Sequence, residues 1–242
     1  MLVIDERGKS FLVETGSRLE TDIGIFEIPP EPDPPTVLNS HLDHSALMVR
    51  PGIRDYIESM SRPTRILHFE DIGYIIARTG VRPGDTVIEA GTGSGATALY
   101  FSAAVGAEGE VITYERRADI FEVANENIAG FGGLDNVSSR NRDIAEAGDE
   151  IANLVFLDLA DPSSQIERMA GSILRGGFLV AYAPFIEEAK RCFSALSELR
   201  FMDREMCEIS RCEYEIRHAG TRPRSTQTVH TGYIVMGRRG TL

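Results

Sequence analysis

The chain has 242 residues, of which 42% are hydrophobic and 26% are charged, and its formal net charge is −12. These values predict a globular protein with one large domain and a small appendage. No stretch approaches the roughly 20 apolar residues of a membrane helix. The charged start of the chain predicts no signal peptide, so we expect a cytoplasmic protein. Three cysteines without CxxC spacing predict neither a disulfide framework nor a metal site.

The acidic net charge argues against casual binding to nucleic acid, because phosphates repel an acidic surface. The charge is not uniform, however. Four arginines lie within residues 50–65 and six within residues 211–242, each group against only two acids. Only two of the 25 basic residues are lysines, which is typical of a composition bias. The two local clusters remain compatible with a phosphate-binding face.

Residues 1–57 differ in sequence pattern from the rest of the chain and predict a small β-rich domain. The sequences "FLVETG" and "DIGIFEIP" are typical of short strands separated by glycine and proline. The proline-rich segment 28–36 can form neither a helix nor a central strand, because proline fixes φ and lacks a donor. Residues 51–60 are predicted to form a helix that has Pro51 near its start.

Residues 58–242 alternate between strand and helix patterns and predict a second, larger domain. The expected helices span about 69–80, 95–106, 118–132, 162–174 and 185–199, and the expected strands span about 85–90, 109–115, 136–143, 152–159, 176–184, 201–210 and 230–239. Strands separated by helices predict a parallel sheet with right-handed crossovers. The last two strands have no convincing helix between them and predict an antiparallel edge.

The stretch "VIEAGTGSGATALYF" (87–101) places three glycines between a strand and a helix. Glycine lets the backbone approach a ligand, and the helix start offers free N–H groups. The spelling also satisfies the dinucleotide fingerprint, so it does not separate NAD from S-adenosylmethionine. Three other features favour S-adenosylmethionine: Glu89 before the glycines suits a cationic ligand, the sheet ends in an antiparallel pair, and Asp158 follows a strand where sheet termini converge.

The motifs "EAGTGSG", "TYERR", "LDLADP", "LVAYAP" and "HTGYIVMGRR" resemble the class I S-adenosylmethionine-dependent methyltransferases. More narrowly, they resemble the tRNA (adenine-N1)-methyltransferases of the T-loop, in their archaeal and bacterial single-polypeptide form. The resemblance implies an α/β, Rossmann-like fold with a seven-stranded, mostly parallel sheet and a small β-rich N-terminal domain. It also implies a cytoplasmic homotetramer that uses S-adenosyl-L-methionine and tRNA, and that methylates adenine 58, with adenine 57 as a second target.

The same resemblance assigns the cofactor contacts. The residues implied to hold S-adenosylmethionine are Gly91, Thr92, Gly93, Ser94, Gly95, Glu115, Asp143, Ile144 and Asp158. The glycine loop would line the methionine end and the ribose, Glu115 would accept both ribose hydroxyls, and Asp143 would hold the adenine amino group. Each assignment has a plainer alternative: a tight turn for the loop, a surface ion pair for Glu115, and a helix cap for Asp143.

Asp158 is the candidate catalytic residue. Adenine N1 already has a lone pair, so its methylation needs no strong base. A carboxylate that accepts a hydrogen bond from the adenine amino group raises the nucleophilicity of N1 and stabilises the positive charge that develops. Alignment of N1, methyl and sulfur would supply most of the remaining acceleration. The alternative is a structural aspartate bonded to backbone donors.

The implied substrate contacts are His68, Tyr182, Arg222, Arg224 and His230. Tyr182 would stack on or hydrogen-bond to an extruded target base, with a core tyrosine as its alternative. The arginines and His230 would contact RNA phosphate, although exposed arginines are commonly just solvated. His68 begins "HFED", where the family carries tyrosine, proline, lysine and aspartate. This departure bears on the contact with the target base.

Two other functions are alternatives to the hypothesis of tRNA methylation. A class I methyltransferase that acts on a protein carboxylate, as isoaspartyl methyltransferases do, or on a small molecule would agree with the acidic charge. The N-terminal β region and the "HTGY" end argue against it. A non-catalytic RNA-binding subunit would be expected to have an eroded glycine loop, whereas "GTGSG", Glu115 and Asp158 are all intact.

Overall fold

The computed structural model describes residues 1–132, 134–225 and 230–240. The chain divides into two units, Met1–Met60 and Ser61–Leu242. The boundary expected from the sequence, after residue 57, falls inside helix α1 (Ile53–Ser59). None of the helices in the described ranges is both long and apolar enough to cross a membrane.

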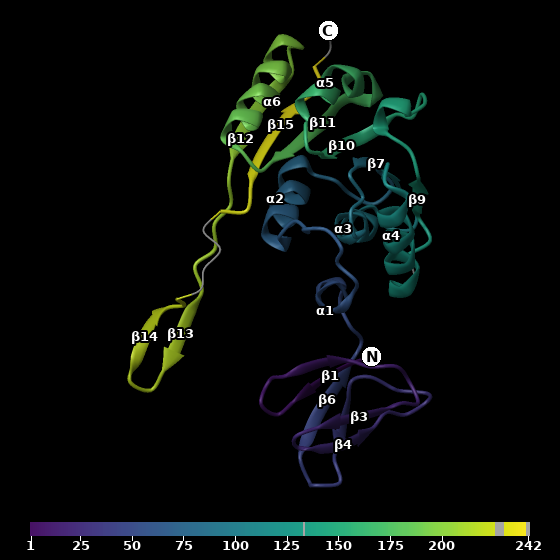
Figure 1. The fold of residues 1–242 in the computed structure, drawn as a ribbon, viewed down its shortest axis with the longest axis vertical. Helices are drawn as coiled ribbons and strands as arrows, with labels where there is room; N and C mark the ends of the chain where they lie inside the picture. The colour runs from purple at the N-terminus through teal and green to yellow at the C-terminus, as the bar shows by residue number, and fades with distance from the viewer. Residues whose placement is uncertain (133, 226–229, 241–242) are drawn as a thin grey trace. The chain divides into compact units, whose positions relative to one another are not determined.

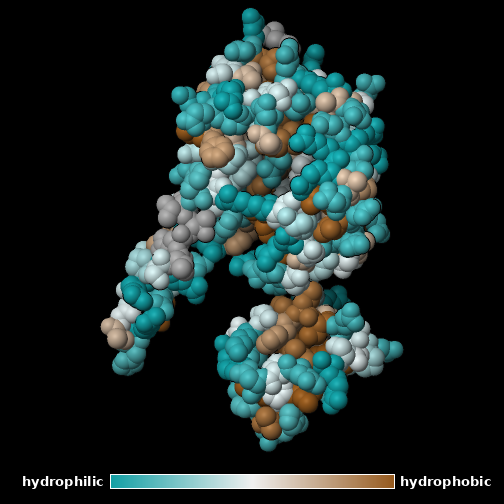
Figure 2. Space-filling view, viewed as in Figure 1, coloured by the Kyte–Doolittle hydropathy of each residue, from teal (hydrophilic) through white to brown (hydrophobic). Residues whose placement is uncertain are grey.

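The N-terminal unit is built from short antiparallel strands and α1. Its strands are β1 (Leu2–Asp5), β2 (Ser10–Leu12), β3 (Arg18–Thr21), β4 (Gly24–Glu27), β5 (Thr36–Asn39) and β6 (Ser45–Val49). Four of them form a sheet in the order β2-β1-β6-β5, and β3 pairs with β4. Val3, Phe26 and Met48 are fully buried in its core. Apolar side chains also gather on its surface, which has Val37 and Leu42 among its exposed residues (Figure 2).

The C-terminal unit contains the larger sheet. Its strands are β7 (Thr86–Ala90), β8 (Glu110–Tyr114), β9 (Val137–Arg140), β10 (Ala152–Asp158), β11 (Ile173–Ala183), β12 (Met202–Cys207), β13 (Tyr214–Arg217), β14 (Gly220–Pro223) and β15 (Tyr233–Arg238). Its helices are α2 (Phe69–Thr79), α3 (Ala96–Val105), α4 (Ala118–Phe131), α5 (Ser163–Met169) and α6 (Ile186–Glu198), with short 3₁₀ turns η1 (Ile144–Glu146) and η2 (Ala170–Ser172).

Seven strands form one sheet in the order β12-β15-β11-β10-β7-β8-β9. The strands from β11 to β9 run parallel, whereas β15 is antiparallel to both β11 and β12. The expected fold class is therefore confirmed, including the antiparallel edge. Helices cover both faces of the sheet, with α5 and α6 on one face and α2, α3 and α4 on the other (Figure 1).

The alternation of side chains along each strand fixes these two faces. Ile88 and Ala90 of β7 pack in the cluster beneath α5 and α6, where Ile166 and Leu196 are fully buried. The intervening residues, including Glu89, point to the other face. Burial on both faces explains why these strands read as nearly continuous apolar runs.

Three local expectations were wrong in extent or missed. The helix expected over 162–174 stops at Met169, passes through η2, and gives way to β11 at Ile173. Its apolar spacing did not distinguish a helix from the buried start of the next strand. The strand expected over 136–143 ends at Arg140. The hairpin β13–β14 was missed because nearly all of its residues are exposed and its only apolar alternation, Tyr214 and Ile216, is too short to stand out.

Candidate active site

The carboxyl ends of β7 and β10 meet at the centre of the sheet, where the strand order changes direction. Chain order proceeds outward from β7 through β8 and β9 on one side, and from β10 to β11 on the other. Ligands of open α/β sheets bind in the crevice at such a switch point. A cavity of about 730 Å³ lies here and is lined by both strand ends. This volume is typical of sites for small molecules.

The glycine loop that follows β7 is held in a backbone conformation that needs glycine. Gly91 has φ +92°, and a Cβ placed on it would lie 2.0 Å from the carbonyl oxygen of Asp158. Gly93 has φ +53°, and its Cβ would lie 3.0 Å from Thr64 Oγ1. The two strand ends therefore approach so closely that no side chain fits between them, and both Gly91 and Gly93 line the cavity.

Three other residues of the loop support it from behind and do not line the cavity. Thr92 donates to Thr113 Oγ1 at 2.6 Å. Ser94 is buried, and its Oγ lies 3.2 Å from Thr64 Oγ1. Gly95, with φ +85°, is the N-terminal cap residue of α3. The expectation that all five loop residues contact a ligand directly stays a prediction for these three.

Glu115 lies at the end of β8 and lines the cavity. Its carboxylate is only 9% exposed and accepts hydrogen bonds from the backbone N–H groups of Gly93 (3.2 Å) and Arg117 (3.0 Å). It forms no ion pair with the guanidinium of Arg116 or Arg117, so the surface-pair alternative is not what the structure contains. These backbone contacts fix the carboxylate at the cavity wall, where it presents acceptors to a ligand.

Asp143 and Ile144 lie together on the same wall, after β9. Asp143 Oδ1 accepts from the N–H of Ala145 at 2.9 Å and caps η1, as its alternative interpretation expected. The other oxygen lies 3.8 Å from Arg116 Nη1. Ile144 is 3% exposed. The cap and the cavity position coexist, because capping occupies only one carboxylate oxygen.

Asp158 ends β10 and lines the cavity beside Gly91. Its side chain has no hydrogen-bond partner among the residues that the structure describes. Burial raises the pKa of this carboxyl to about 7, and the positive charge of Arg65 opposes the rise. The alternative of a structural aspartate satisfied by backbone donors therefore does not fit. The carboxylate is instead available to a ligand and balanced between two protonation states near neutral pH.

Tyr182 lies next to Asp158 in register on the adjacent strand β11. Its ring lines the cavity, and burial raises the pKa of its hydroxyl to about 12. The hydroxyl donates to Asp71 Oδ2 at 3.5 Å. A Cβ on Gly232 would lie 2.4 Å from the Tyr182 ring, so the glycine of "HTGY" makes room for it. Tyr182 is thus a buried tyrosine and a cavity-wall residue at once.

Two buried acids near the cavity were not among the predicted site residues. Asp71 is fully buried at the start of α2, and its Oδ1 has no partner within the described ranges. Glu89 is also fully buried; its Oε2 accepts from Thr113 at 2.6 Å and its Oε1 has no described partner. Burial first, and then the charges of Asp158 and Glu115, raise the pKa of Glu89 to about 8. An unpartnered acid inside an apolar strand was the sequence signal for Glu89.

The remaining predicted residues do not line the cavity. His68 is the N-terminal cap residue of α2, and its Nδ1 lies 4.0 Å from Glu70. Arg222 and Arg224 belong to the hairpin region and pair with Glu215 (3.3 Å) and Glu213 (3.2 Å).

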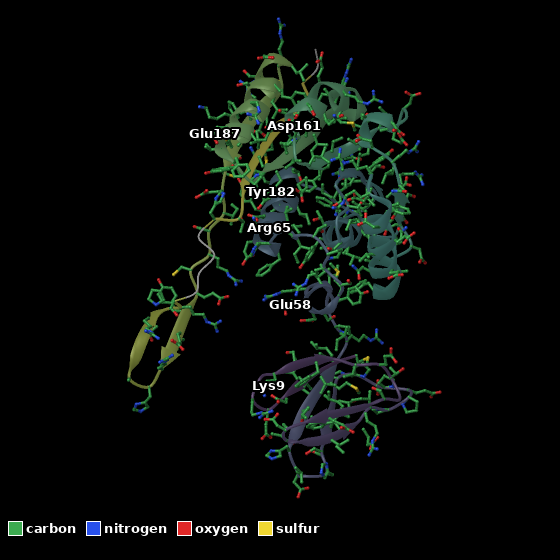
Figure 3. All side chains as sticks on the ribbon, viewed as in Figure 1. Lys9, Glu58, Arg65, Asp161, Tyr182 and Glu187 are labelled. Atoms are coloured by element: carbon green, nitrogen blue, oxygen red, sulfur yellow. The ribbon has the colours of Figure 1, made fainter. Side chains whose placement is uncertain are left out.

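His230 is closer to the site. Its Nδ1 lies 3.1 Å from Glu208 Oε2, and its Nε2 lies 3.3 Å from the carbonyl of Pro184, which does line the cavity. Sequence reasoning also missed the arginines that line the cavity, which are Arg65, Arg116, Arg117 and Arg142. The basic segment 50–65 was the signal for Arg65. Arg65 and Tyr182 lie close together in Figure 3.

The part of the chain that the structure describes contains no group of three or more His, Cys, Asp or Glu side chains arranged to hold a metal ion. The polar groups of the cavity are instead separate carboxylates along one wall and arginines around them. This arrangement suits an organic ligand that carries hydroxyl and amino donors together with positive charge.

The strand order, the antiparallel edge, and a glycine loop that faces an acid at the end of the next strand define a class I S-adenosylmethionine-dependent methyltransferase. Residues 55–232 match the family model described as "tRNA methyltransferase complex GCD14 subunit". The chain is 36% identical to the tRNA (adenine(57)-N(1)/adenine(58)-N(1))-methyltransferase TrmI of Methanocaldococcus jannaschii, over 98% of this chain and 94% of that protein. The chain therefore belongs to the family of tRNA (adenine-N1)-methyltransferases.

Two solved structures share the fold over the whole chain. One is an S-adenosylmethionine-dependent O-methyltransferase of Thermotoga maritima, with a TM-score of 0.88, 28% identity and coverage of 100% of this chain and 92% of that chain. The other is the tRNA (m1A58) methyltransferase TrmI of Aquifex aeolicus, with a TM-score of 0.82, 24% identity and coverage of 100% and 96%. The likeness spans both units of the chain.

Proposed function

We propose that this chain transfers the methyl group of S-adenosylmethionine to N1 of an adenine in the T-loop of tRNA, at position 58, with position 57 as a second candidate. The observation that carries the proposal is the Asp158 carboxylate, which ends β10 in the cavity and has no partner among the described residues. The related protein of M. jannaschii carries this activity in its name.

The cavity residues fit the cofactor. Glu115 and Asp143 offer carboxylate oxygens for the ribose hydroxyls and the adenine amino group. Glu89 is fully buried and does not line the cavity, but one of its oxygens has no described partner, and its pKa of about 8 lets a nearby positive charge ionise it. The absence of a side chain on Gly91 lets the carbonyl of Asp158 approach it, which brings the glycine loop and Asp158 to the same part of the cavity wall.

S-adenosylmethionine supplies a methyl group on a positively charged sulfur. The lone pair of adenine N1 forms the new N–C bond, the C–S bond breaks, and its electron pair stays on sulfur. No proton needs to leave, and the ring gains a positive charge. Asp158 accepts a hydrogen bond from the adenine amino group and stabilises that charge as it develops. The flat ring of Tyr182 beside it offers a surface on which the base can stack.

An adenine in a folded loop must leave its stack to reach a cavity of this kind. The cavity wall carries Arg117 and Arg142, which give it local positive charge on a chain of net charge −12. Arginine suits phosphate because its planar fork binds two oxygens at once. A homotetramer would place such walls from several chains within reach of one tRNA. The tetramer and the cytoplasmic location both stay predictions.

The direct test incubates the purified chain with S-adenosylmethionine and an unmodified tRNA transcript, and identifies the product nucleoside by mass spectrometry. We expect 1-methyladenosine that disappears when adenine 58 is replaced. A peak that persists in this variant and vanishes on replacement of adenine 57 would move the target by one nucleotide. The absence of any RNA product would contradict the proposal.

A methyltransferase of a protein carboxylate or a small molecule is the second candidate, and the name of the T. maritima structure, an O-methyltransferase, is the observation that favours it. Transfer of labelled methyl to isoaspartyl peptide or to a metabolite extract, without transfer to tRNA, would establish that activity. A melting temperature unchanged by saturating S-adenosylmethionine would instead support a non-catalytic subunit.

A further inference from the structure

Arg65 occupies a special place in the cavity wall. It lies in the segment that precedes α2, and its Nη2 donates to the carbonyl of Thr231 at 3.0 Å, across 166 positions of the chain. Thr231 is next to Gly232, against which the Tyr182 ring packs. The hydrogen bond therefore fixes the guanidinium at the end of the cavity that Asp158 and Tyr182 share.

The surroundings of Asp158 are otherwise unfavourable to a negative charge. The titratable and charged groups around it are Glu89 on β7, Tyr182 on β11, Asp71 on α2, Arg65 before α2 and, further along the cavity wall, Asp161 after β10 and Glu115 after β8. Among these only Arg65 is a cation. The remaining cavity arginines, Arg116, Arg117 and Arg142, lie after β8 and β9.

The influence of Arg65 on Asp158 is exerted through charge, without a hydrogen bond between the two side chains. This separation matters chemically. A direct ion pair would favour the carboxylate but would also occupy its oxygens. A cation held nearby by Thr231 favours ionisation and leaves both oxygens free to accept from a substrate amino group.

We propose that Arg65 is a positioning residue that keeps Asp158 ionised, and hence able to accept a hydrogen bond from the amino group of the target base. The inference rests on the proposed function for its consequence in catalysis, although the ionisation itself can be measured without any substrate. Arg65 thereby sets the pH range in which the site is active.

The direction of the effect follows from the pKa. Burial raises the pKa of Asp158 to about 7, and Arg65 lowers it, so removal of Arg65 raises it further. A neighbouring charge shifts a pKa by about one unit or more. A shift of about one unit leaves roughly a fivefold smaller ionised fraction at pH 7, a tenfold smaller fraction at pH 6, and almost no difference above pH 9.

The first test compares kcat/KM for tRNA between pH 5.5 and 9.5 in the wild-type chain, Arg65→Gln and Arg65→Lys. We expect the acid limb of the Arg65→Gln profile to move up by about one pH unit, with rates that converge with those of the wild type at high pH. Arg65→Lys should keep the wild-type limb, because it keeps the charge. A loss in Arg65→Gln that is equal at every pH would overturn the inference.

The second test is independent of the substrate. The free chain is labelled at its aspartate carboxyl carbons, and Asp158→Asn assigns the resonance of Asp158 in a pH titration by NMR. Arg65→Gln should raise the midpoint by about one unit, whereas the matched variant Arg62→Gln, an arginine of the same segment that does not line the cavity, should leave it in place. An unchanged midpoint in Arg65→Gln overturns the inference even if tRNA is methylated.

These two measurements also separate the inference from the proposed function. If the wild-type chain methylates no tRNA while the midpoint of Asp158 moves as expected, the proposed substrate fails and the role of Arg65 stands. If tRNA is methylated and the midpoint does not move, the substrate stands and the role of Arg65 fails.

Discussion

The arginines of the cavity wall and those of the β13–β14 hairpin carry the same charge in different settings. Arg117 and Arg142 line the cavity, and neither forms an ion pair with a carboxylate of the described residues. Arg222 and Arg224 were expected to bind RNA, yet each pairs with a glutamate of its own hairpin region. Counting positive charge along a sequence therefore does not locate a phosphate site, because the free charge depends on which acids fold beside it.

The largest expected effect is on kcat, and it comes from a change to Asp158 in the cavity. Asp158→Asn keeps the size of the side chain but removes the negative charge that stabilises the methylated ring. We expect kcat to fall about 100- to 1,000-fold, as when one preorganised stabilising group is lost. The affinity for S-adenosylmethionine, measured by calorimetry, should change little. A wild-type rate in Asp158→Asn would remove this residue from the mechanism.

A pair of glycine substitutions separates packing at the cavity from backbone strain on the hairpin. Gly91→Ala places a methyl group 2.0 Å from the carbonyl of Asp158, and neither strand can move freely, so we expect a loss of about 3 kcal/mol in unfolding free energy. Gly220→Ala, at φ +145°, meets open space. It should cost about 1 kcal/mol. Urea denaturation of both variants measures the difference, and equal losses would contradict the crowding at Gly91.

The two glycines also illustrate which features of the structure could be predicted from the sequence. The sheet, its antiparallel edge and the glycine turn were predictable, because long apolar runs and glycine spacing are local signals. The cavity wall was predictable only in part. Arg65 and Asp71 are brought to the site from before and within α2, and no local pattern reveals which carboxylates each arginine meets after folding. The 3.0 Å bond from Arg65 to Thr231 joins segments too distant for any spacing rule.

The buried acid beside the cavity predicts a pH dependence of stability. The pKa of Glu89 is about 8 in the folded chain and near 4.5 in the unfolded chain. Its contribution to stability is therefore complete below pH 4.5 and is lost progressively as the pH rises to 8, by about 1.4 kcal/mol per pH unit in between. Glu89→Gln can still accept from Thr113 and should lose less unfolding free energy between pH 6 and pH 8.

Urea denaturation at several pH values, without cofactor, measures this slope. Glu122→Gln, on the exposed surface of α4, is the matched control for the chemistry of the substitution. Parallel stability curves for the wild-type chain and Glu89→Gln would mean that the Glu89 carboxyl is solvated in the folded protein. That result would also weaken its assignment to the cofactor.

The smallest expected effect is on tRNA affinity, and it compares the arginines of the cavity wall directly with those of the β13–β14 hairpin. Arg117→Ala with Arg142→Ala removes two unpaired charges, so we expect tRNA affinity to fall about tenfold and the slope of log affinity against log salt to decrease by about 1 to 2. Arg222→Ala with Arg224→Ala should change affinity about twofold, because each guanidinium already has a carboxylate partner and gives up that pair to bind phosphate.

Filter binding between 50 and 300 mM salt, on the order of the range where counterion release is steep, measures both slopes. S-adenosylmethionine affinity of each double variant is the control for damage to the cavity. A larger loss from the hairpin pair would mean that tRNA binding breaks its ion pairs, and it would restore the sequence-based assignment of Arg222 and Arg224 over the one that ion pairing favours.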